Sequence, residues 1–289
     1  MSLYEILIES WDEARRPEPQ EDEHALESGR VLFLPELRFQ ATPDETPLFA
    51  PEILAGSKNA SFNPATGRLS GTTLGGIQAD RLLGLLRRFS TAAAALAGTL
   101  LPSYRGRLAL ARASFRPAEI AGRVTSWRKD DTRLHVDSFP ATPSGGRRIL
   151  RLFTNVNPDQ RARTWRIGGE FEPVARRFAA NLRLPWPGTS RLLALARITK
   201  TPRTPYDALM LQLHDAMKAD EDFQKTTPQT RMDFPAGTTW LAFTDQVSHA
   251  AMAGQYQLEQ TFLLPVDAMR EPERSPLRVL ERLKGRALT

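Results

Sequence analysis

The sequence predicts a mainly β protein with flanking helices, built on a double-stranded β-helix, also called a jelly roll or cupin-like fold. Three observations lead to this class. Short apolar segments bounded by turn residues occur both before and after a helical stretch. Strands and helices do not alternate regularly, which argues against a Rossmann sheet. The strand-like segments are short and closely spaced, as in an antiparallel double sheet.

A single domain is expected over residues 1–289. The chain is 41% hydrophobic, and a chain of this length and composition can bury one large core. No internal repeat divides it. We expect the jelly-roll core at about 103–265, with a helical insertion at about 170–225.

The N-terminal third is predicted to contain a strand, a loop region and a long helix. The apolar run 31–34 is a strand that a proline closes. The stretch 41–73 is rich in Pro, Gly, Ser and Thr, so we expect loops there. Apolar residues then recur at helical spacing from Leu82 to Phe89, and alanines follow. Residues 79–100 are therefore predicted to form a buried helix that packs on a sheet.

The rest of the chain is predicted to contain most of the strands. Alternating or continuous apolar runs between turn residues predict strands at 134–137, 148–156, 231–234, 238–243 and 257–264. Two helices are expected between the second and third of these strands, at 172–181 and 206–219. The second helix opens on Thr204 and Pro205, which suit the N-cap and the first helical position.

The charge balance favours an anionic ligand or surface. The chain has 39 Lys and Arg against 33 Asp and Glu, and arginine outnumbers lysine. The planar guanidinium suits carboxylate and phosphate groups, although an ordinary basic surface accounts for the same surplus. No apolar run is long enough to span a membrane, and the first residues lack a signal-peptide pattern. We therefore expect a cytoplasmic protein.

The absence of cysteine restricts the available chemistry. It excludes disulfides, thiolate zinc sites, iron–sulfur clusters and cysteine nucleophiles, so a metal has to be held by histidine and carboxylate. The chain has only four histidines. His24 lies in an acidic stretch and His214 lies inside a predicted helix, so we expect structural roles for both.

The other two histidines are candidates for a metal site. Side chains two residues apart on a strand point to the same side, so His135 and Asp137 can reach one ion together. His249, far downstream, would complete a 2-His-1-carboxylate facial triad, which is typical of Fe(II) oxygenases. The alternatives are a chance tripeptide and a loop histidine bonded to a carbonyl. Neither histidine belongs to an HExxH helix, which disfavours a zinc protease.

Three blocks of the sequence resemble the Kdo hydroxylase family of the Fe(II)/2-oxoglutarate-dependent dioxygenases. They are SWRKDDTRL, HVDSFPATPSGGRRILRLFTNVNP and TDQVSHAAMAGQYQLEQTFLLP, and the resemblance extends over about 103–265. It implies a jelly-roll core, with His135, Asp137 and His249 as the iron ligands. It also implies Fe(II), 2-oxoglutarate and O2 as cofactor and cosubstrates. The implied reaction is hydroxylation at C3 of the outer Kdo sugar of Kdo2-lipid A, in lipopolysaccharide biosynthesis.

This resemblance also requires a cation for the far carboxylate of 2-oxoglutarate, ideally an arginine. Many members of the wider superfamily carry it shortly after the second histidine, but residues 250–267 contain no arginine. We therefore expect the anchor on the strand 148–156, with Arg148 as first choice and Arg151 as second. Strand alternation places these two on opposite sides and does not say which side faces the barrel. Candidates for neutral hydrogen bonds to the cosubstrate are Thr154, Asn155 and Gln260.

Two further features concern the anionic, lipid-linked substrate. Basic or aromatic residues near the motif are weaker candidates for substrate contacts: Trp127, Arg128, Lys129, Arg133, Arg163 and Arg166. At the C-terminus, Ser275 and Pro276 begin a predicted helix that has leucines on one face and several basic residues. That helix either makes peripheral contact with the inner membrane or packs on its own domain.

Two other functions stay open on the sequence. The first is a 2-oxoglutarate oxygenase for another anionic substrate, because the pocket residues beyond the triad are unassigned. The second is a non-enzymatic jelly-roll binding module. Nucleic acid is not an expected partner, since the basic residues are dispersed and no nucleic-acid-binding motif occurs.

Overall fold

The computed structural model describes residues 3–12, 19–186 and 188–289, and its strands form two sheets. The main sheet is antiparallel apart from the parallel pair β1 and β2. Its strands, in spatial order, are β1 (Leu3–Glu5), β2 (Val31–Leu34), β9 (Thr239–Phe243), β6 (Arg148–Asn155), β11 (Gln257–Leu264), β5 (Ala109–Arg116), β3 (Ala60–Asn63) and β4 (Arg68–Ser70). The second sheet is antiparallel and has the order β10 (His249–Ala253), β7 (Arg163–Ile167) and β8 (Thr230–Phe234).

The two sheets pack face to face through an aromatic cluster. Phe153 and Trp240 of the main sheet meet Trp165 and Phe234 of the second sheet. The rings of Phe234 and Trp240 stack with centroids 4.1 Å apart. Large aromatic side chains bury much apolar area, so this cluster joins the sheets into the predicted two-sheet architecture. The prediction of a mainly β, jelly-roll protein with flanking helices is confirmed.

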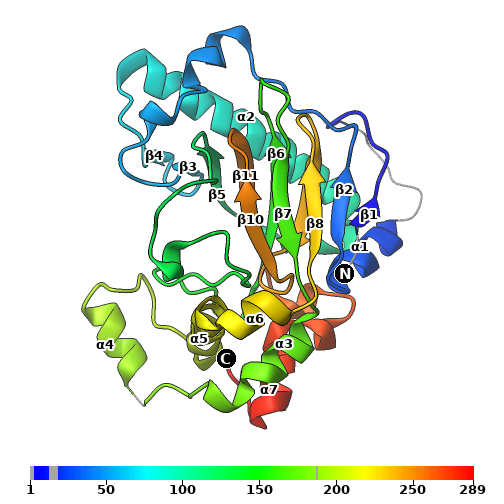
Figure 1. Ribbon diagram of the computed structural model, residues 1–289, viewed down its shortest axis with the longest axis vertical. Helices are drawn as coiled ribbons and strands as arrows, with labels where there is room; N and C mark the ends of the chain where they lie inside the picture. Colours follow the sequence, from blue (N-terminus) through cyan, green and yellow to red (C-terminus); the bar gives the residue numbers. More distant parts are fainter. Residues whose placement is uncertain (1–2, 13–18, 187) are drawn as a thin grey trace.

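The opposite face of the main sheet is covered by helices, chiefly the long α2 (Figure 1). This helix spans Gly76–Leu100 and buries Leu82, Leu86 and Phe89, as their helical spacing predicts. The α-helices are α1 (Pro19–Glu27), α2, α3 (Phe171–Phe178), α4 (Thr189–Leu195), α5 (Pro205–Ala219), α6 (Glu221–Thr226) and α7 (Pro276–Lys284). The short 3-10 helices are η1 (Pro43–Leu48), η2 (Pro51–Ile53), η3 (Pro102–Tyr104), η4 (Trp127–Lys129), η5 (Ala179–Asn181), η6 (Val266–Ala268) and η7 (Pro272–Arg274).

Four helices, α3 to α6, lie between β7 and β8 in the chain, where the sequence predicts a helical insertion. The start of α5 follows the prediction. Thr204 is the N-cap, Pro205 is the first helical residue, and Asp207 and Thr204 form a capping box.

The C-terminal helix α7 packs on the protein itself. Ser275 caps it through a bond from the backbone N–H of Arg278 to the serine hydroxyl. Its apolar face is used internally, because Leu277 and Leu280 are buried in the main core. That face is therefore already covered. Within the described ranges, no helix combines the length and the apolar character needed to cross a bilayer.

The structure corrects several local predictions. The region 41–73, expected to be loops, contains η1, η2 and the hairpin of β3 and β4. Residues 134–137 are not a strand, since only His135 forms an isolated bridge. Strands β5, β7 and β10 were not predicted. The reason is clear for β10, His-Ala-Ala-Met-Ala, whose alanines carry no β signal and which becomes a strand by pairing with β7.

Candidate metal centre

The three predicted metal ligands converge at one end of the space between the sheets. His135, Asp137 and His249 each offer a ligand atom, and these atoms lie within 4.8 Å of one another. The His135 Nε2 is 3.9 Å from Asp137 Oδ1, and the two imidazole rings are 4.7 Å apart at their centroids. Both histidines are buried, and the Asp137 side chain is nearly so.

Backbone hydrogen bonds set this arrangement. His135 and His249 lie opposite each other in an antiparallel bridge and exchange N–H···O bonds of 3.0 and 2.8 Å. The N–H of Asp137 donates to the carbonyl of Thr244 at 2.8 Å, just beyond the end of β9. Because the bridge brings two residues face to face, a single pairing register places both imidazoles on one side.

Each imidazole is oriented by a carbonyl two residues before it. The Nδ1 of His135 is 2.7 Å from the carbonyl oxygen of Arg133, and the Nδ1 of His249 is 2.8 Å from that of Val247. Since a carbonyl only accepts, Nδ1 carries the hydrogen and Nε2 keeps a free lone pair. Burial lowers the pKa of both histidines, so both rings are neutral, as metal coordination requires.

The carboxylate of Asp137 is held in its charged form. Burial raises its pKa, but the Arg151 guanidinium, helped by a hydrogen bond from Thr244, outweighs burial and holds the pKa of Asp137 well below its usual range. Arg151 Nε lies 3.1 Å from Asp137 Oδ2, and its Nη1 donates to Glu259 at 2.7 Å. Arg151 therefore neutralises and orients the carboxylate.

These residues fit a divalent first-row metal. Two neutral imidazole nitrogens and one ionised carboxylate oxygen converge, and no further His, Asp or Glu among the described residues joins them. The donor set is the 2-His-1-carboxylate facial triad, which leaves coordination positions free for other ligands and suits Fe(II). This chain can therefore hold the iron that the sequence resemblance implies.

A cavity of about 110 Å³ opens from the triad. Besides the ligands it is lined by Arg116, Asp131, Arg151, Phe153, Arg163, Trp165, Ala251, Gln257 and Glu259. A second cavity of about 310 Å³ shares Arg116, Arg151 and Glu259 with it and is also lined by the loop 139–142. The small cavity can take a metal-bound cosubstrate and the larger one a substrate group.

Arg163 has an unusual environment in the small cavity. Its side chain is fully buried, and its Nη1 donates to the carbonyl of Gly254 at 2.6 Å. Its Nε has no hydrogen-bond partner, and no carboxylate of the described residues forms an ion pair with it. Burial, and next the nearby Arg116, lower the pKa of Arg163 to about 9. Asp131, Glu119 and Glu259 raise the pKa of Arg163 electrostatically, but none of them forms an ion pair with it. A buried cation without a direct carboxylate contact is costly, so this position is suited to an incoming anion.

Arg148, the preferred anchor in the sequence analysis, does not line the metal cavity. Its side chain lies on the other face of β6, among the main core. Its Nε donates to Asp245 at 2.8 Å and its Nη2 to Gln246 at 2.6 Å. The guanidinium also covers the ring of Phe243 at 3.8 Å. The prediction that Arg148 anchors 2-oxoglutarate is therefore wrong, because its guanidinium is already paired on the far side of the sheet and is unavailable to a ligand at the triad.

The neutral candidates are also engaged elsewhere and do not line this cavity. Thr154 shares a hydrogen bond of 2.9 Å with Thr239. Asn155 donates to the carbonyls of Arg161 and Phe234, and Gln260 donates to backbone carbonyls of β5 and β11. Of the predicted cosubstrate contacts, Arg151 is the one that the structure places beside the triad.

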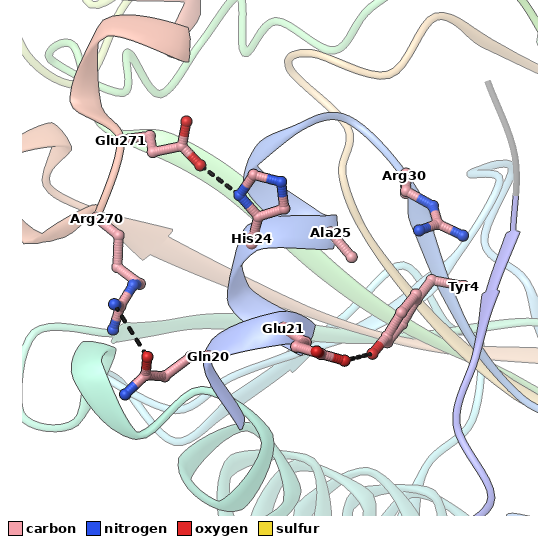
Figure 2. Close-up of a pocket in the computed structure, with 8 residues that line it drawn as sticks. All are labelled: Tyr4, Gln20, Glu21, His24, Ala25, Arg30, Arg270 and Glu271. Atoms are coloured by element: carbon pink, nitrogen blue, oxygen red, sulfur yellow. Dashed lines mark hydrogen bonds and ion pairs between the residues drawn. The ribbon is translucent and has the colours of Figure 1, made fainter. Parts of the chain in front are cut away.

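The two remaining histidines lie in different places. His214 of α5 contacts the ring of His135, and its Nδ1 is 2.8 Å from the carbonyl of Val136. His214 therefore helps to hold the segment that carries His135 and Asp137 in place. His24 lines neither of the two cavities at the triad. It lies in a separate cavity of about 720 Å³, where it pairs with Glu271 at 2.6 Å (Figure 2). That larger cavity lacks the converging donor set of the triad.

Several cavity residues were missed or undervalued at the level of sequence. Of the weaker candidates, Arg163 lines the cavity, whereas Arg133 pairs with Glu221 and Arg128 lies 3.4 Å from Asp215. Glu259, which bridges Arg151 and Arg116, was not predicted. The sequence could have indicated Glu259 as a cavity residue, because Gln257 and Glu259 are two residues apart on an apolar strand and place two polar groups on one buried face.

Comparison with known proteins gives a consistent result. The family model for 3-deoxy-D-manno-oct-2-ulosonic acid (Kdo) hydroxylase matches residues 10–287. The chain is similar to the crystal structure of the Kdo hydroxylase KdoO, a non-heme Fe(II) α-ketoglutarate-dependent dioxygenase, in complex with cobalt(II). The identity is 46%, over 99% of this chain and 97% of that one, with a TM-score of 0.97. The complex of KdoO with α-ketoglutarate and Fe(III) is 44% identical over 100% and 98% of the two chains, with a TM-score of 0.97. No protein with a curated description matches the chain.

Proposed function

This chain belongs to the Kdo hydroxylase family of non-heme Fe(II)/2-oxoglutarate-dependent dioxygenases, and from that premise we propose that it hydroxylates the outer Kdo sugar of Kdo2-lipid A at C3. The observation that carries the proposal is the convergence of His135, Asp137 and His249 in a buried facial triad. The solved relatives that are 44 to 46% identical are described with cobalt(II), Fe(III), α-ketoglutarate and succinate. Those ligands are the ones expected at such a triad.

The protein residues around the triad have distinct roles in this proposal. His135, Asp137 and His249 hold Fe(II), which with 2-oxoglutarate and O2 supplies the oxidation of an unactivated C–H bond. Arg151 forms an ion pair with Oδ2 of Asp137, and Oδ1 is the oxygen nearer His135. Arg163 pairs with the far carboxylate of 2-oxoglutarate, because it is the buried cation of the cavity that lacks a carboxylate partner among the described residues.

The cavity of about 310 Å³ beside the triad is assigned to the sugar. Its lining combines Arg112 and Arg116 with the hydroxyls of Ser61 and Ser114 and the ring of Phe139. Kdo carries a carboxylate and several hydroxyls, so arginine and serine donors are suitable partners. Since lipid A is embedded in a bilayer, we place the enzyme at the cytoplasmic face of the inner membrane, in peripheral contact with it.

Mass spectrometry of Kdo2-lipid A tests the reaction. Incubation with the protein, Fe(II), ascorbate and 2-oxoglutarate should add one oxygen to the outer sugar, and His249→Ala should abolish the product. If 2-oxoglutarate is consumed but the lipid is unchanged, the enzyme acts on another anionic substrate. That second candidate uses the same triad.

Anaerobic spectroscopy separates an oxygenase from a binding module. Addition of Fe(II) and then 2-oxoglutarate should give a weak visible charge-transfer band, and His135→Ala should remove the band without unfolding the protein. Correctly folded wild-type protein without any band would favour the non-enzymatic binding module.

A further inference from the structure

The segment that contains α4 exposes large apolar side chains to solvent. Trp186 is 85% exposed, Leu195 82%, Leu192 67% and Ile198 59%. In Figure 1, α4 lies apart from the other helices at the edge of the molecule. Other exposed large apolar residues such as Leu7, Ile77 and Val124 are far apart in the sequence, whereas these four fall within thirteen residues of chain, a spacing that favours an interaction site.

The same segment is strongly basic. Residues 179–206 contain no aspartate or glutamate, and their cations are Arg183, Arg191, Arg197, Lys200 and Arg203. Within the described part of the chain, these five cations form no ion pair. The side chain of Arg203 donates to the carbonyl of Pro140 at 2.6 Å. The segment therefore presents apolar groups and uncompensated positive charge together.

Both ends of the segment are tied to the protein. At the first end, Leu182 is buried and the backbone of Arg183 exchanges two hydrogen bonds with Gln212 of α5. At the other end, the N–H of Lys200 donates to the carbonyl of Ala141 at 2.9 Å. Ala141 belongs to the loop 139–142, which lines the cavity next to the triad. A ligand bound to the segment is thus held beside the entrance to the site.

We propose that the described residues 183–186 and 188–200, with α4 at their centre, dock the protein on an anionic phospholipid bilayer. Exposed tryptophan and leucine side chains enter the boundary between headgroups and acyl chains, and the surrounding arginines and lysine pair with lipid phosphates. A second copy of this chain is a poorer partner, because like charges would face each other across that contact. The inference rests on the proposed function for its lipid-linked substrate, and it assigns the membrane contact to α4 instead of α7.

Vesicle binding by the full-length protein tests the surface. We expect co-sedimentation with vesicles of phosphatidylcholine and phosphatidylglycerol, and much weaker binding to pure phosphatidylcholine. Leu195→Ser should weaken binding roughly tenfold, because it removes one inserted apolar side chain. Ile77→Ser is the matched control, since Ile77 is 72% exposed but lies at the start of α2, and it should bind like wild type.

Charge variants give an independent measurement. Arg191→Glu should weaken binding to the anionic vesicles by at least about fivefold, the effect of one cation near a charged lipid surface. Arg286→Glu makes the same change of net charge near the C-terminus and should have little effect. Equal losses in Arg191→Glu and Arg286→Glu would mean that net charge alone attracts the protein, and would overturn the assignment to α4.

Other results would also overturn the proposal. Wild-type protein that ignores anionic vesicles contradicts it directly, and a dimer in light scattering that Leu195→Ser dissociates would identify a second copy as the occupant. The vesicle assay uses no iron or 2-oxoglutarate, so failure of hydroxylation leaves its result intact. Conversely, Leu195→Ser and Arg191→Glu should still hydroxylate substrate that is dispersed in detergent.

Discussion

The two faces of β6 carry arginines with different partners and different roles. Arg148 faces the main core, where Asp245 and Gln246 accept hydrogen bonds from its guanidinium. Arg151, three residues later, faces the space between the sheets and pairs with Asp137 and Glu259. The side chain of Arg148 is fully buried, and that of Arg151 is 13% exposed. Burial alone therefore does not show that an arginine is functional. The group with which the arginine pairs, such as the metal ligand Asp137, is the better guide.

Arg163 extends this comparison to a third case. It is as deeply buried as Arg148, but no described carboxylate is paired with it. Burial and the nearby Arg116 lower the pKa of Arg163, and they outweigh the opposing charges of Asp131, Glu119 and Glu259. A paired arginine stabilises the fold, whereas an unpaired one at a metal cavity is suited to a ligand.

The largest expected effect is on the core face of β6. Arg148→Leu leaves the buried Asp245 without its cation, and breaking a buried pair in this way should lower the free energy of unfolding by about 3–5 kcal/mol. Urea denaturation measures the loss. The double variant with Asp245→Leu should recover much of it, because no unpaired charge remains, and a double variant as unstable as the single one would contradict this account.

The same variant should show a characteristic pH dependence. Burial already raises the pKa of Asp245, against the opposing effect of Arg148. Without Arg148 the folded-state pKa rises further above the unfolded value, so the folded protein binds the extra proton and stability falls as pH increases through the folded-state pKa. The deficit relative to wild type should therefore shrink on acidification. A deficit independent of pH would show that lost packing is responsible.

The next effect is on cosubstrate binding. Arg163→Gln removes the cation proposed for 2-oxoglutarate and should raise its KM about a hundredfold, since a charge-assisted bidentate pair is lost. The protein should remain folded, because no ion pair is broken. Thr154→Val serves as a control of similar burial. If Arg163→Gln leaves KM unchanged and Arg151→Gln raises it, the anchor is Arg151.

A smaller effect is expected on metal affinity. Arg151→Leu removes the partner of the ligand Asp137, and changes behind a metal ligand typically weaken binding about tenfold. Titration with Co(II) or Fe(II) under anaerobic conditions measures it. An unchanged metal affinity would restrict Arg151 to a role in holding Glu259.

The smallest effect is expected at Thr154, on the same face of β6 as Arg148. Thr154→Val breaks one hydrogen bond to Thr239 and should destabilise the protein by about 1 kcal/mol. The KM for 2-oxoglutarate should not change, although Thr154 was a candidate from the sequence. A changed KM at normal stability would return Thr154 to the binding site.

Local sequence patterns predicted much of this molecule. The apolar runs of β2, β6, β9 and β11 and the helical spacing of α2 appear where they were expected, because burial and capping act over a few residues. His135, Asp137 and His249 could be predicted as metal ligands because the residue type alone determines which side chains can donate to a metal. Strands such as β10 were missed, since their alanines become extended only through pairing with a distant strand.

The sequence by itself determined which residues can hold a metal and that Arg148 and Arg151 lie on opposite faces of one strand. Only the tertiary structure decided which face meets the metal cavity, because β6 is largely apolar on both sides and is buried by helices on one and by the second sheet on the other. It also singled out Arg163, since the packing of distant segments gives the carboxylates of the cavity to Arg116 and Arg151 and leaves Arg163 without an ion pair among the described residues. Strand alternation is a local property of the backbone, whereas a counter-ion is supplied by the whole fold.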